Sequence, residues 1–538
     1  MGTAFSQLSP MQATLGAMAT IACFAISSLF LRFLWKTYQL RGIPGPKASS
    51  LFLGHLLDTL GRVANWHEAG DYPEPFLSWL HDHFHRPESY PACARDKVLE
   101  IFLADITLGA GLLSTSGTTH DKYRKMLNPL FTPNQIKQFV PIYESQARRV
   151  CDTVLAPAAK SGKAIDLADV FSDLTLRVIG LAGFGFDFES NPEAHLAYLD
   201  GHLEITPLIL IGSYLIPNFL SYPLPSLLHR RKAQAKIRKV VNDVIEHKLA
   251  SKQDPNRPKD LLDLFLPHSS TTEAIFHTMT FLQAGHETTC SALSWIFAAL
   301  ITYPDAAAKV RQEYKETVAK YGSLDSWEAV SSLKYTLAVI QETMRLNVVV
   351  YMVVRRTFMQ DDYVPMQEGP SVFVPAGTTI EVNIAALNRH PKYWAQADTF
   401  IPERFLEGTS EWDVDLKLRD GKSHAFYYVP FSAGSKNCIG QRFALVEMQV
   451  TVATLFGRFG FALTGDANLG AKYNGTVLFP AKLEVIVQSI DGYEMPWLFE
   501  WITQRRQRLP RSENRQDSSR LEVESFGLST FLSAASLC

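Results

Sequence analysis

Cysteine is scarce in this chain, and its spacing argues against two common uses of the residue. The 538 residues contain six cysteines, and no pair has the Cys-x-x-Cys spacing of a redox motif or a zinc ribbon. The spacing does not suggest a disulfide framework either, so the cysteines fit free thiols in a reducing compartment. They are Cys23, Cys93, Cys151, Cys290, Cys438 and Cys538.

An excess of charge of either sign is also absent. Lysine and arginine number 52 against 54 acidic residues, which gives a net charge of −2. A nucleic-acid-binding protein would be expected to carry a basic excess, so this class is disfavoured. No fixed-period repeat is visible. With 46% hydrophobic residues the chain is long enough for a large core, and its length alone would suggest two or three domains.

Charge is missing from one long stretch near the N-terminus. Residues 13–31 form an uncharged apolar run of 19 residues, which is nearly long enough to cross a bilayer as a helix. Residues 1–12 carry no lysine or arginine, whereas Arg32, Lys36 and Arg41 follow the run. This asymmetry predicts a single-pass anchor with residues 1–12 in the lumen and the basic side in the cytosol. A cleaved signal peptide is the alternative, weakened by the missing basic start.

The strongest chemical signal is a single cysteine in a turn bounded by glycines. Residues 431–440 read Phe-Ser-Ala-Gly-Ser-Lys-Asn-Cys-Ile-Gly, and an amphipathic run follows over 441–459. Gly434 and Gly440 suit a tightly folded backbone. Cys438 should then lie at a helix N-terminus, which favours a thiolate and hence an axial ligand for haem iron. The alternative from this turn alone is an inert buried cysteine.

This turn resembles the haem-binding signature of the cytochrome P450 family, Phe-x-x-Gly-x-Arg-x-Cys-x-Gly. Phe431, Gly434, Cys438 and Gly440 match it, and Lys436 stands where the family has arginine. Arginine would grip a propionate with two parallel hydrogen bonds, whereas lysine offers a point charge. Together with the motifs below, the resemblance runs from about Ile43 to about Ser489.

A long helical pattern over residues 273–300 carries Ala-Gly-His-Glu-Thr-Thr at 284–289. It resembles the segment that crosses the haem in this family, where Ala284 lines the cofactor and Gly285 lets the backbone approach it. The resemblance implies that Thr288 bonds bound dioxygen and that Glu287 relays protons. The alternative is a kinked core helix with a surface-paired glutamate. His286 is interpreted as a bystander.

Basic residues that could hold the haem propionates are spread along the chain. Residues 117–131 resemble the family helix on which His120 and Arg124 share one face. Arg355 aligns with a family arginine that binds a propionate, and Lys436 completes the set. For His120 and Arg124 alone, an exposed basic helix face is the alternative.

Two further patterns bear on the fold and the pocket. Glu342, Arg345 and Arg404 match a buried family triad that braces the cysteine loop, which makes them structural. The apolar connection at 347–354 lines the substrate pocket in relatives and implies a greasy site. Residues 373–384, which alternate around Pro-Ala-Gly, predict a hairpin, and residues 476–488 predict the last strands.

The sequence therefore predicts a mainly helical cytochrome P450 fold with a small β region, preceded by one transmembrane helix. We expect a basic, proline-containing hinge over 32–47, a catalytic domain over 48–489 and a tail over 490–538. Near residues 85–89 about two strands and a short helix of the family pattern are missing, and the tail has no family counterpart. A gene-model fault would explain both features.

The resemblance implies haem b and NADPH-derived electrons from a membrane-bound reductase at the endoplasmic reticulum. One atom of O₂ would enter an apolar small molecule, such as a secondary metabolite, terpenoid or fatty acid. Details of the chain look closest to fungal microsomal members. A haem-thiolate isomerase or dehydratase and a non-catalytic paralogue remain as alternatives.

Overall fold

The computed structural model describes most of residues 93–490, together with scattered helical residues between Thr20 and Gln39. The stretches not described between 93 and 490 are 95–102, 202–208, 210–211, 213–215, 217, 251–258, 351–354, 365–369, 382–383 and 474–476. The chain forms two compact units. One comprises Met1–Asp96, Arg355–Glu381 and Gly527–Cys538, and the other comprises Lys97–Val354 and Val382–Phe526.

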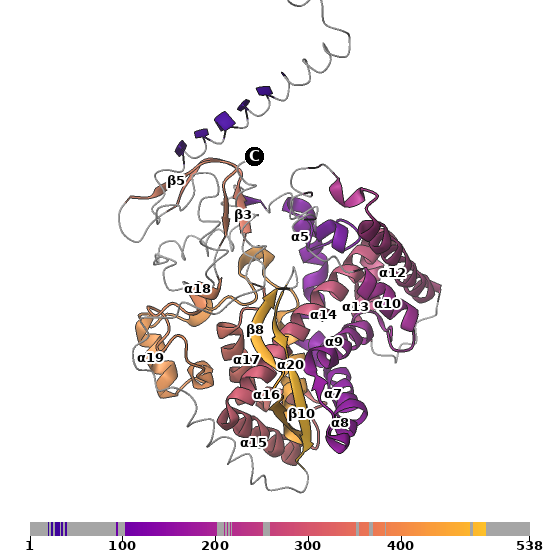
Figure 1. Ribbon diagram of the computed structural model, residues 1–538, viewed down its shortest axis with the longest axis vertical. Coiled ribbons are helices and arrows are strands. Elements are labelled where there is room, and N and C mark those ends of the chain that lie inside the picture. The colour runs from indigo at the N-terminus through magenta and orange to yellow at the C-terminus, as the bar shows by residue number, and fades with distance from the viewer. Residues whose placement is uncertain are drawn as a thin grey trace, which may run out of the picture. The chain divides into compact units, whose positions relative to one another are not determined.

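The second unit is built around the long helix α14 (Thr271–Thr302). Every residue from Ser291 to Ile301 is buried, as expected for a helix that is apolar on all sides. Its first turn is fixed by a capping box, in which Ser270 and Glu273 exchange hydrogen bonds. Figure 1 shows α14 passing between neighbouring helices of this unit.

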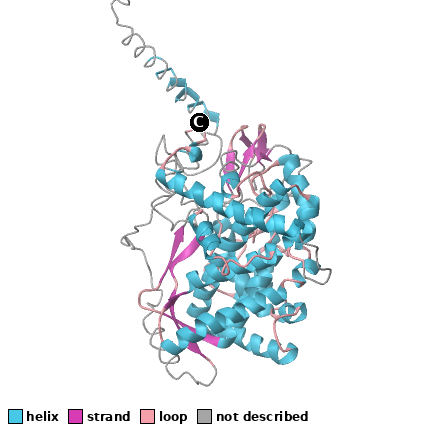
Figure 2. Cartoon of the chain, turned by 90° about the vertical axis from the view of Figure 1, so that its right-hand side faces the viewer, coloured by secondary structure: helices cyan, strands magenta, loops and turns pink. Residues whose placement is uncertain are grey.

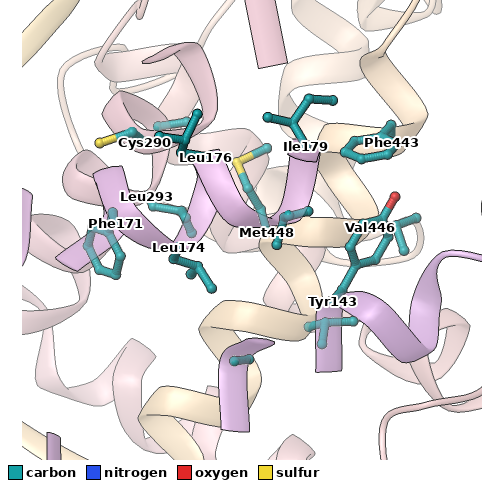
Figure 3. Packing of buried hydrophobic residues seen from close by; sticks show 14 of the residues in the cluster. Tyr143, Phe171, Leu174, Leu176, Ile179, Cys290, Leu293, Phe443, Val446 and Met448 are labelled. Carbon is teal, nitrogen blue, oxygen red and sulfur yellow. The ribbon is translucent and has the colours of Figure 1, made fainter. Parts of the chain in front are cut away.

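Several other helices share the α14 core, and three of them contribute many of its buried side chains. They are α7 (Val140–Val150), α9 (Leu167–Phe184) and α20 (Gln441–Arg458). Figure 3 shows Leu174 of α9, Leu293 of α14 and Met448 of α20 among the side chains of this cluster. Asp166 caps α9 by accepting a hydrogen bond from the amide of Ala168, and Gly185 ends the helix in the left-handed conformation. The core thus joins segments almost 300 residues apart along the chain.

The other α-helices of this unit lie around α14 (Figure 1), and most of them also contribute buried side chains to the core. They are α5 (Gly117–Leu127), α6 (Pro133–Lys137), α8 (Ala156–Ser161), α10 (Pro192–Asp200), α12 (Pro225–Ala250), α13 (Leu261–Phe265), α15 (Pro304–Tyr321), α16 (Trp327–Ser332), α17 (Lys334–Leu346), α18 (Ile384–Asn388) and α19 (Ser410–Leu418). The predicted helices over 117–131 and 273–300 are confirmed.

Two small antiparallel sheets complete the second unit (Figure 2). One has the order β2 (Ile165–Asp166), β10 (Glu484–Ser489), β7 (Phe459–Leu463), with Val485 opposite Leu463. The other pairs β8 (Asn468–Tyr473) with β9 (Leu478–Lys482). Val485 and Val487 are buried while their neighbours are partly exposed, so the alternation that predicted the last strands is confirmed.

The first unit contains two further small sheets. β3 (Arg355–Phe358) pairs with both β1 (Cys93–Ala94) and β6 (Thr379–Glu381), whereas β4 (Asp362–Val364) pairs with β5 (Val372–Val374). The predicted hairpin over 373–384 is therefore wrong in its pairing. Gly377 has a positive φ of 80°, and its amide donates a hydrogen bond to the Phe358 carbonyl. This turn directs the chain from one sheet to the other.

The mainly helical fold with a small β region is confirmed for the described residues. The predicted anchor over 13–31 falls largely outside them. Among the residues that the structure does describe, no helix is long and apolar enough to cross a membrane. Three further predicted features also lie outside the described residues: the gap near 85–89, most of the 32–47 hinge and, apart from Ile490, the 490–538 tail.

Candidate active site

The cysteine loop is a tight turn that leads into helix α20. The amide of Cys438 donates to the carbonyl of Phe431 over 2.9 Å, which closes the loop. Ser432 and Gly434 both adopt positive φ, at 60° and 78°, so the turn needs a left-handed backbone twice. Gly440 is the N-cap of α20, as expected. This geometry leaves the Cys438 side chain exposed in a structure whose other described free cysteines near the core, Cys151 and Cys290, are buried.

The surroundings of the thiol act on its charge in opposite directions. Protein atoms crowd the sulfur and raise the pKa of Cys438, although part of its surface is reached by solvent. The Gly440 amide and the charge of Arg124 work against this rise. The predicted contribution of the helix N-terminus is therefore present, and it acts together with Arg124 against the desolvation of the sulfur.

Two cations tie the loop to helix α5. Arg124 donates to both oxygens of Asn437, the carbonyl at 2.9 Å and Oδ1 at 2.7 Å. Lys436 Nζ donates to the Thr115 carbonyl at 2.6 Å and to Ser116 Oγ at 3.2 Å. The structure thus places these two predicted propionate partners at the two residues that precede Cys438, Lys436 and Asn437.

His120 lies on the same helix and is buried. Desolvation and the charge of Lys436 lower the pKa of its imidazole from 6.5 to about 4, although Asp121 opposes the change. The ring is therefore neutral at neutral pH and can donate a hydrogen bond but no positive charge. The alternative of an exposed basic helix face does not hold for His120.

The second half of the candidate site is a solvent-accessible patch on α14 formed by Ala284, Glu287 and Thr288, which we call the window. Ala284 is exposed, and Glu287 and Thr288 are partly exposed, on a helix that is otherwise largely buried. Thr288 Oγ1 donates to the Ala284 carbonyl over 2.7 Å. The hydroxyl that the sequence singled out therefore lies at the window, at the end of a helix turn that begins with Ala284.

Gly285 has a packing role in addition to the one that the resemblance implies, which stays a prediction. A Cβ added there would lie 3.0 Å from two side-chain carbons of Ile179 on α9, so the glycine allows two helices to pack closely. The His286 side chain also contacts neighbouring helices: its ring nitrogens lie 3.0 Å from Ser172 Oγ of α9 and 3.1 Å from Tyr198 Oη of α10. These contacts hold the ring against α9 and α10, and the interpretation of His286 as a bystander stays a prediction.

Two segments that sequence reasoning missed pack against α14 before and after the window along the helix. Toward the N-terminus of α14, Gly109 and Gly111 pack against Phe276 and Thr280 so closely that a Cβ at either glycine would clash. Toward the C-terminus, the carbonyl of Leu478 receives two hydrogen bonds from α14. The Gly-x-Gly spacing at 109–111 could have indicated the first contact in the sequence. The second contact uses the backbone carbonyl of Leu478, which no residue type in the sequence would indicate.

The described residues fit a haem. An exposed thiol in an otherwise tightly bonded loop, and an exposed alanine on a buried helix, are surfaces that a flat apolar group would cover. Thiolate sulfur is also an established donor to haem iron. Arg355 lies in β3 of the other unit, opposite Glu381, and its side chain is outside the description. Its propionate role stays a prediction.

The predicted ion-pair triad is present and is part of a larger cluster. Arg345 binds both oxygens of Glu342, at 2.7 and 2.9 Å, and Arg404 Nε reaches the same carboxylate at 3.1 Å. Sequence reasoning missed Asp415, which accepts from Arg404 Nη1 at 2.5 Å. Arg345 also donates to the carbonyls of Asn388 and Ala397. These buried bonds join α17 to the segment that precedes the cysteine loop, so the triad is structural.

Comparison with known proteins agrees with the geometry. The cytochrome P450 family model matches residues 88–487, which include the window, the triad and the cysteine loop. Cytochrome P450 monooxygenase 205 of Postia placenta is 29% identical over 496 residues, covering 79% of this chain and 87% of its own length. Cytochrome P450 4Z1 of Homo sapiens is 30% identical over 389 residues, covering 68% of this chain and 72% of its own length. The chain therefore belongs to the cytochrome P450 family and is a cytochrome P450 monooxygenase.

Proposed function

We propose that this monooxygenase inserts one oxygen atom of O₂ into an apolar small molecule, with Cys438 as the ligand of its haem iron. The observation that carries the proposal is the exposed Cys438 thiol at the N-terminus of α20, in a loop that Lys436 and Asn437 bond to α5 and to the residues just before it. Haem, when bound, supplies the activation of dioxygen. Electrons would come from NADPH through a membrane-bound reductase.

The cations of the site would hold the propionates. Arg124 and Lys436 already stand beside Cys438, and the Arg124 guanidinium, which has five N–H donors, uses two nitrogens in its bonds to Asn437. His120, neutral at neutral pH, would add one hydrogen bond. Arg355 is the fourth candidate. Phe431 and Gly440 would contact the cofactor from the loop, and Ala284 from α14.

Thr288 and Glu287 would control proton delivery. Thr288 Oγ1 donates a hydrogen bond to the Ala284 carbonyl, so the oxygen's lone pairs stay available to accept a hydrogen bond at the window. Glu287 is one residue away and partly exposed, where its carboxylate can exchange protons with solvent. Together they would pass protons from solvent to the reacting oxygen while the rest of α14 stays dry.

Replacement of Thr288 by alanine tests this role. With NADPH, a reductase and a turned-over substrate, we expect Thr288→Ala to keep consuming NADPH while product per NADPH falls roughly tenfold or more. Thr302→Ala is the matched control, because Thr302 Oγ1 makes the same bond to the carbonyl four residues earlier, at 2.8 Å. Unchanged coupling in Thr288→Ala would remove Thr288 from the proton path.

The same assay separates the isomerase or dehydratase alternative. Such an enzyme would convert a peroxide-type substrate without NADPH or O₂, and it would have little use for a hydroxyl at residue 288. Turnover that persists without NADPH and O₂ would favour that alternative.

We place the enzyme at the endoplasmic reticulum membrane, with a single N-terminal anchor and the catalytic domain in the cytosol. The uncharged run over 13–31 and the basic residues after it support this proposal. The chain should stay in the membrane pellet after carbonate washing, and a variant lacking residues 1–40 should leave it. Release of the full chain by carbonate would contradict the anchor.

A further inference from the structure

One backbone carbonyl next to the window is held by two side chains of α14. The Leu478 oxygen accepts from Ser291 Oγ at 2.6 Å and from Trp295 Nε1 at 2.7 Å. Ser291 is fully buried, and Trp295 is 8% exposed. Two donors on one acceptor fix its position more tightly than a single bond would, because each limits a different direction of movement. We call Ser291, Trp295 and the Leu478 carbonyl the carbonyl clamp.

The carbonyl clamp extends to a third segment. The Leu478 amide donates to the Val349 carbonyl over 3.0 Å, and Val349 follows helix α17. Leu478 begins strand β9, so a single residue joins α14, the connection after α17 and the β8–β9 sheet. The Leu478 amide bonds Val349 and its carbonyl bonds α14, so neither group bonds the partner strand β8. The position of Val349 therefore depends on α14.

The clamp lies next to the reacting region of α14. Ser291 and Trp295 are three and seven residues after Thr288, and residues at these spacings share one helix face. Leu478 therefore stands about one to two helix turns from the Thr288 hydroxyl, on the same side of α14. Val349 and Leu478 are both partly exposed and apolar, so the wall that these two side chains form can contact hydrocarbon.

We propose that Ser291 and Trp295 are positioning residues, which set the distance between the Val349–Leu478 wall and Thr288 and so decide how an extended apolar substrate lies at the window. This inference rests on the proposed function of Thr288 and Cys438. Neither side chain touches substrate; each acts through Leu478. The ligand class that the wall discriminates is a chain long enough to reach past Thr288.

Azole binding to the haem-loaded protein tests the clamp. Imidazole and 1-dodecylimidazole bind iron through the same ring, but only the second has a chain that reaches the wall. In the double variant Ser291→Ala/Trp295→Phe we expect the Kd of imidazole to stay within about twofold, whereas the Kd of 1-dodecylimidazole changes about fivefold or more. Single Ser291→Ala should show a smaller change in the same direction, and it guards against loss of folding in the double variant.

Ser294→Ala is the matched control. Ser294 is equally buried on α14, but its hydroxyl bonds the Cys290 carbonyl of its own helix over 2.9 Å. Both Kd values should stay at their wild-type level in this variant. An unchanged ratio of the two Kd values in the clamp variants, or an equal change in Ser294→Ala, would overturn the inference.

Hydrogen exchange keeps the two proposals distinguishable. The Leu478 amide should exchange about tenfold faster in the double variant than in the wild type, with or without haem, because its acceptor Val349 is then held less firmly. If the wild type takes up no haem, the proposed function fails, and the exchange rate alone decides the clamp. Equal exchange in wild type and double variant would overturn the clamp.

Discussion

Lys436 shows how one substitution changes the connections of a site without removing its charge. The family signature has arginine there, and the lysine ammonium here bonds the Thr115 carbonyl and Ser116 Oγ at the start of α5. A lysine cannot offer the parallel pair of donors with which arginine grips a carboxylate. The bidentate contact is instead made by Arg124, which holds Asn437. The bracing of the cysteine loop is therefore divided between two residues, Lys436 and Arg124.

His277 is a buried imidazole that titrates at unusually low pH. It is fully buried on α14 between the rings of Tyr123 and Phe265, and neither ring nitrogen has a hydrogen-bond partner in the structure. Burial lowers the pKa from 6.5 to about 4, and Glu273 only partly opposes it. Below pH 6.5 the His277 imidazole binds a proton in the unfolded chain but not in the folded chain, so the free energy of unfolding decreases as the pH falls toward 4.

The variant His277→Phe should weaken this pH dependence. Between pH 6.5 and 4 the wild-type residue removes up to roughly 3 kcal/mol of folding free energy, and phenylalanine removes none by titration. At pH 7 the variant should be as stable as the wild type or more so, because two unpaired polar atoms are lost. Urea unfolding at pH 7 and pH 5 measures both effects.

His120 and His424, whose pKa values are also lowered to about 4, remain in that variant, so a part of the acid sensitivity should persist. The account of His277 would be wrong if the wild type and His277→Phe lost equal stability between pH 7 and pH 5.

At the scale of elements, one tryptophan organises the charged cluster beside α17. Trp394 is almost fully buried, and the guanidinium groups of Arg345, Arg404 and Arg419 lie 5.0–5.9 Å from its ring. Within the described part of the chain, these three interior cations pair with the carboxylates of Glu342 and Asp415, which are both fully buried. The aromatic face and backbone carbonyls supply the remaining stabilisation of the positive charge.

Asp415→Asn should therefore be severe. Its carboxylate serves both Arg404 and the amide of Ala395, and an amide side chain would leave the arginines with one negative charge fewer. We expect a loss of about 3–5 kcal/mol in the free energy of unfolding, measured in urea.

Lys309→Ala provides the contrast for Asp415→Asn. Lys309 pairs with Glu403 at 2.6 Å, but 57% of its side chain is exposed. Its removal should cost no more than about 1 kcal/mol. Similar losses in Lys309→Ala and Asp415→Asn would contradict the assignment of the buried cluster as the main brace.

Across the whole molecule, the sequence predicted best where the pattern was local. Helix α14, the Glu342–Arg345 pair three residues apart and the last strands each follow from spacing along the chain. The cysteine loop was also predicted, because glycines at fixed positions around Cys438 are needed for its turn.

The contacts that could not be predicted join distant segments. Residues 373–384 carried a valid strand signal, but no local pattern says that β5 pairs with β4 and β6 with β3. Asp415 is an ordinary acidic residue in the sequence, and only folding buries it against Arg404. The rise in the pKa of Cys438 has the same origin, since desolvation depends on atoms brought in from elsewhere in the chain.

The most direct test of the central claim is the carbon-monoxide difference spectrum of the reduced protein, in wild type and in Cys438→Ser. The account predicts that wild type takes up haem and shows the red-shifted Soret band of a thiolate-ligated iron, and that the serine variant loses this band. An unchanged band in Cys438→Ser would contradict the assignment of Cys438 as ligand. A wild-type protein that never takes up haem would contradict the account as a whole.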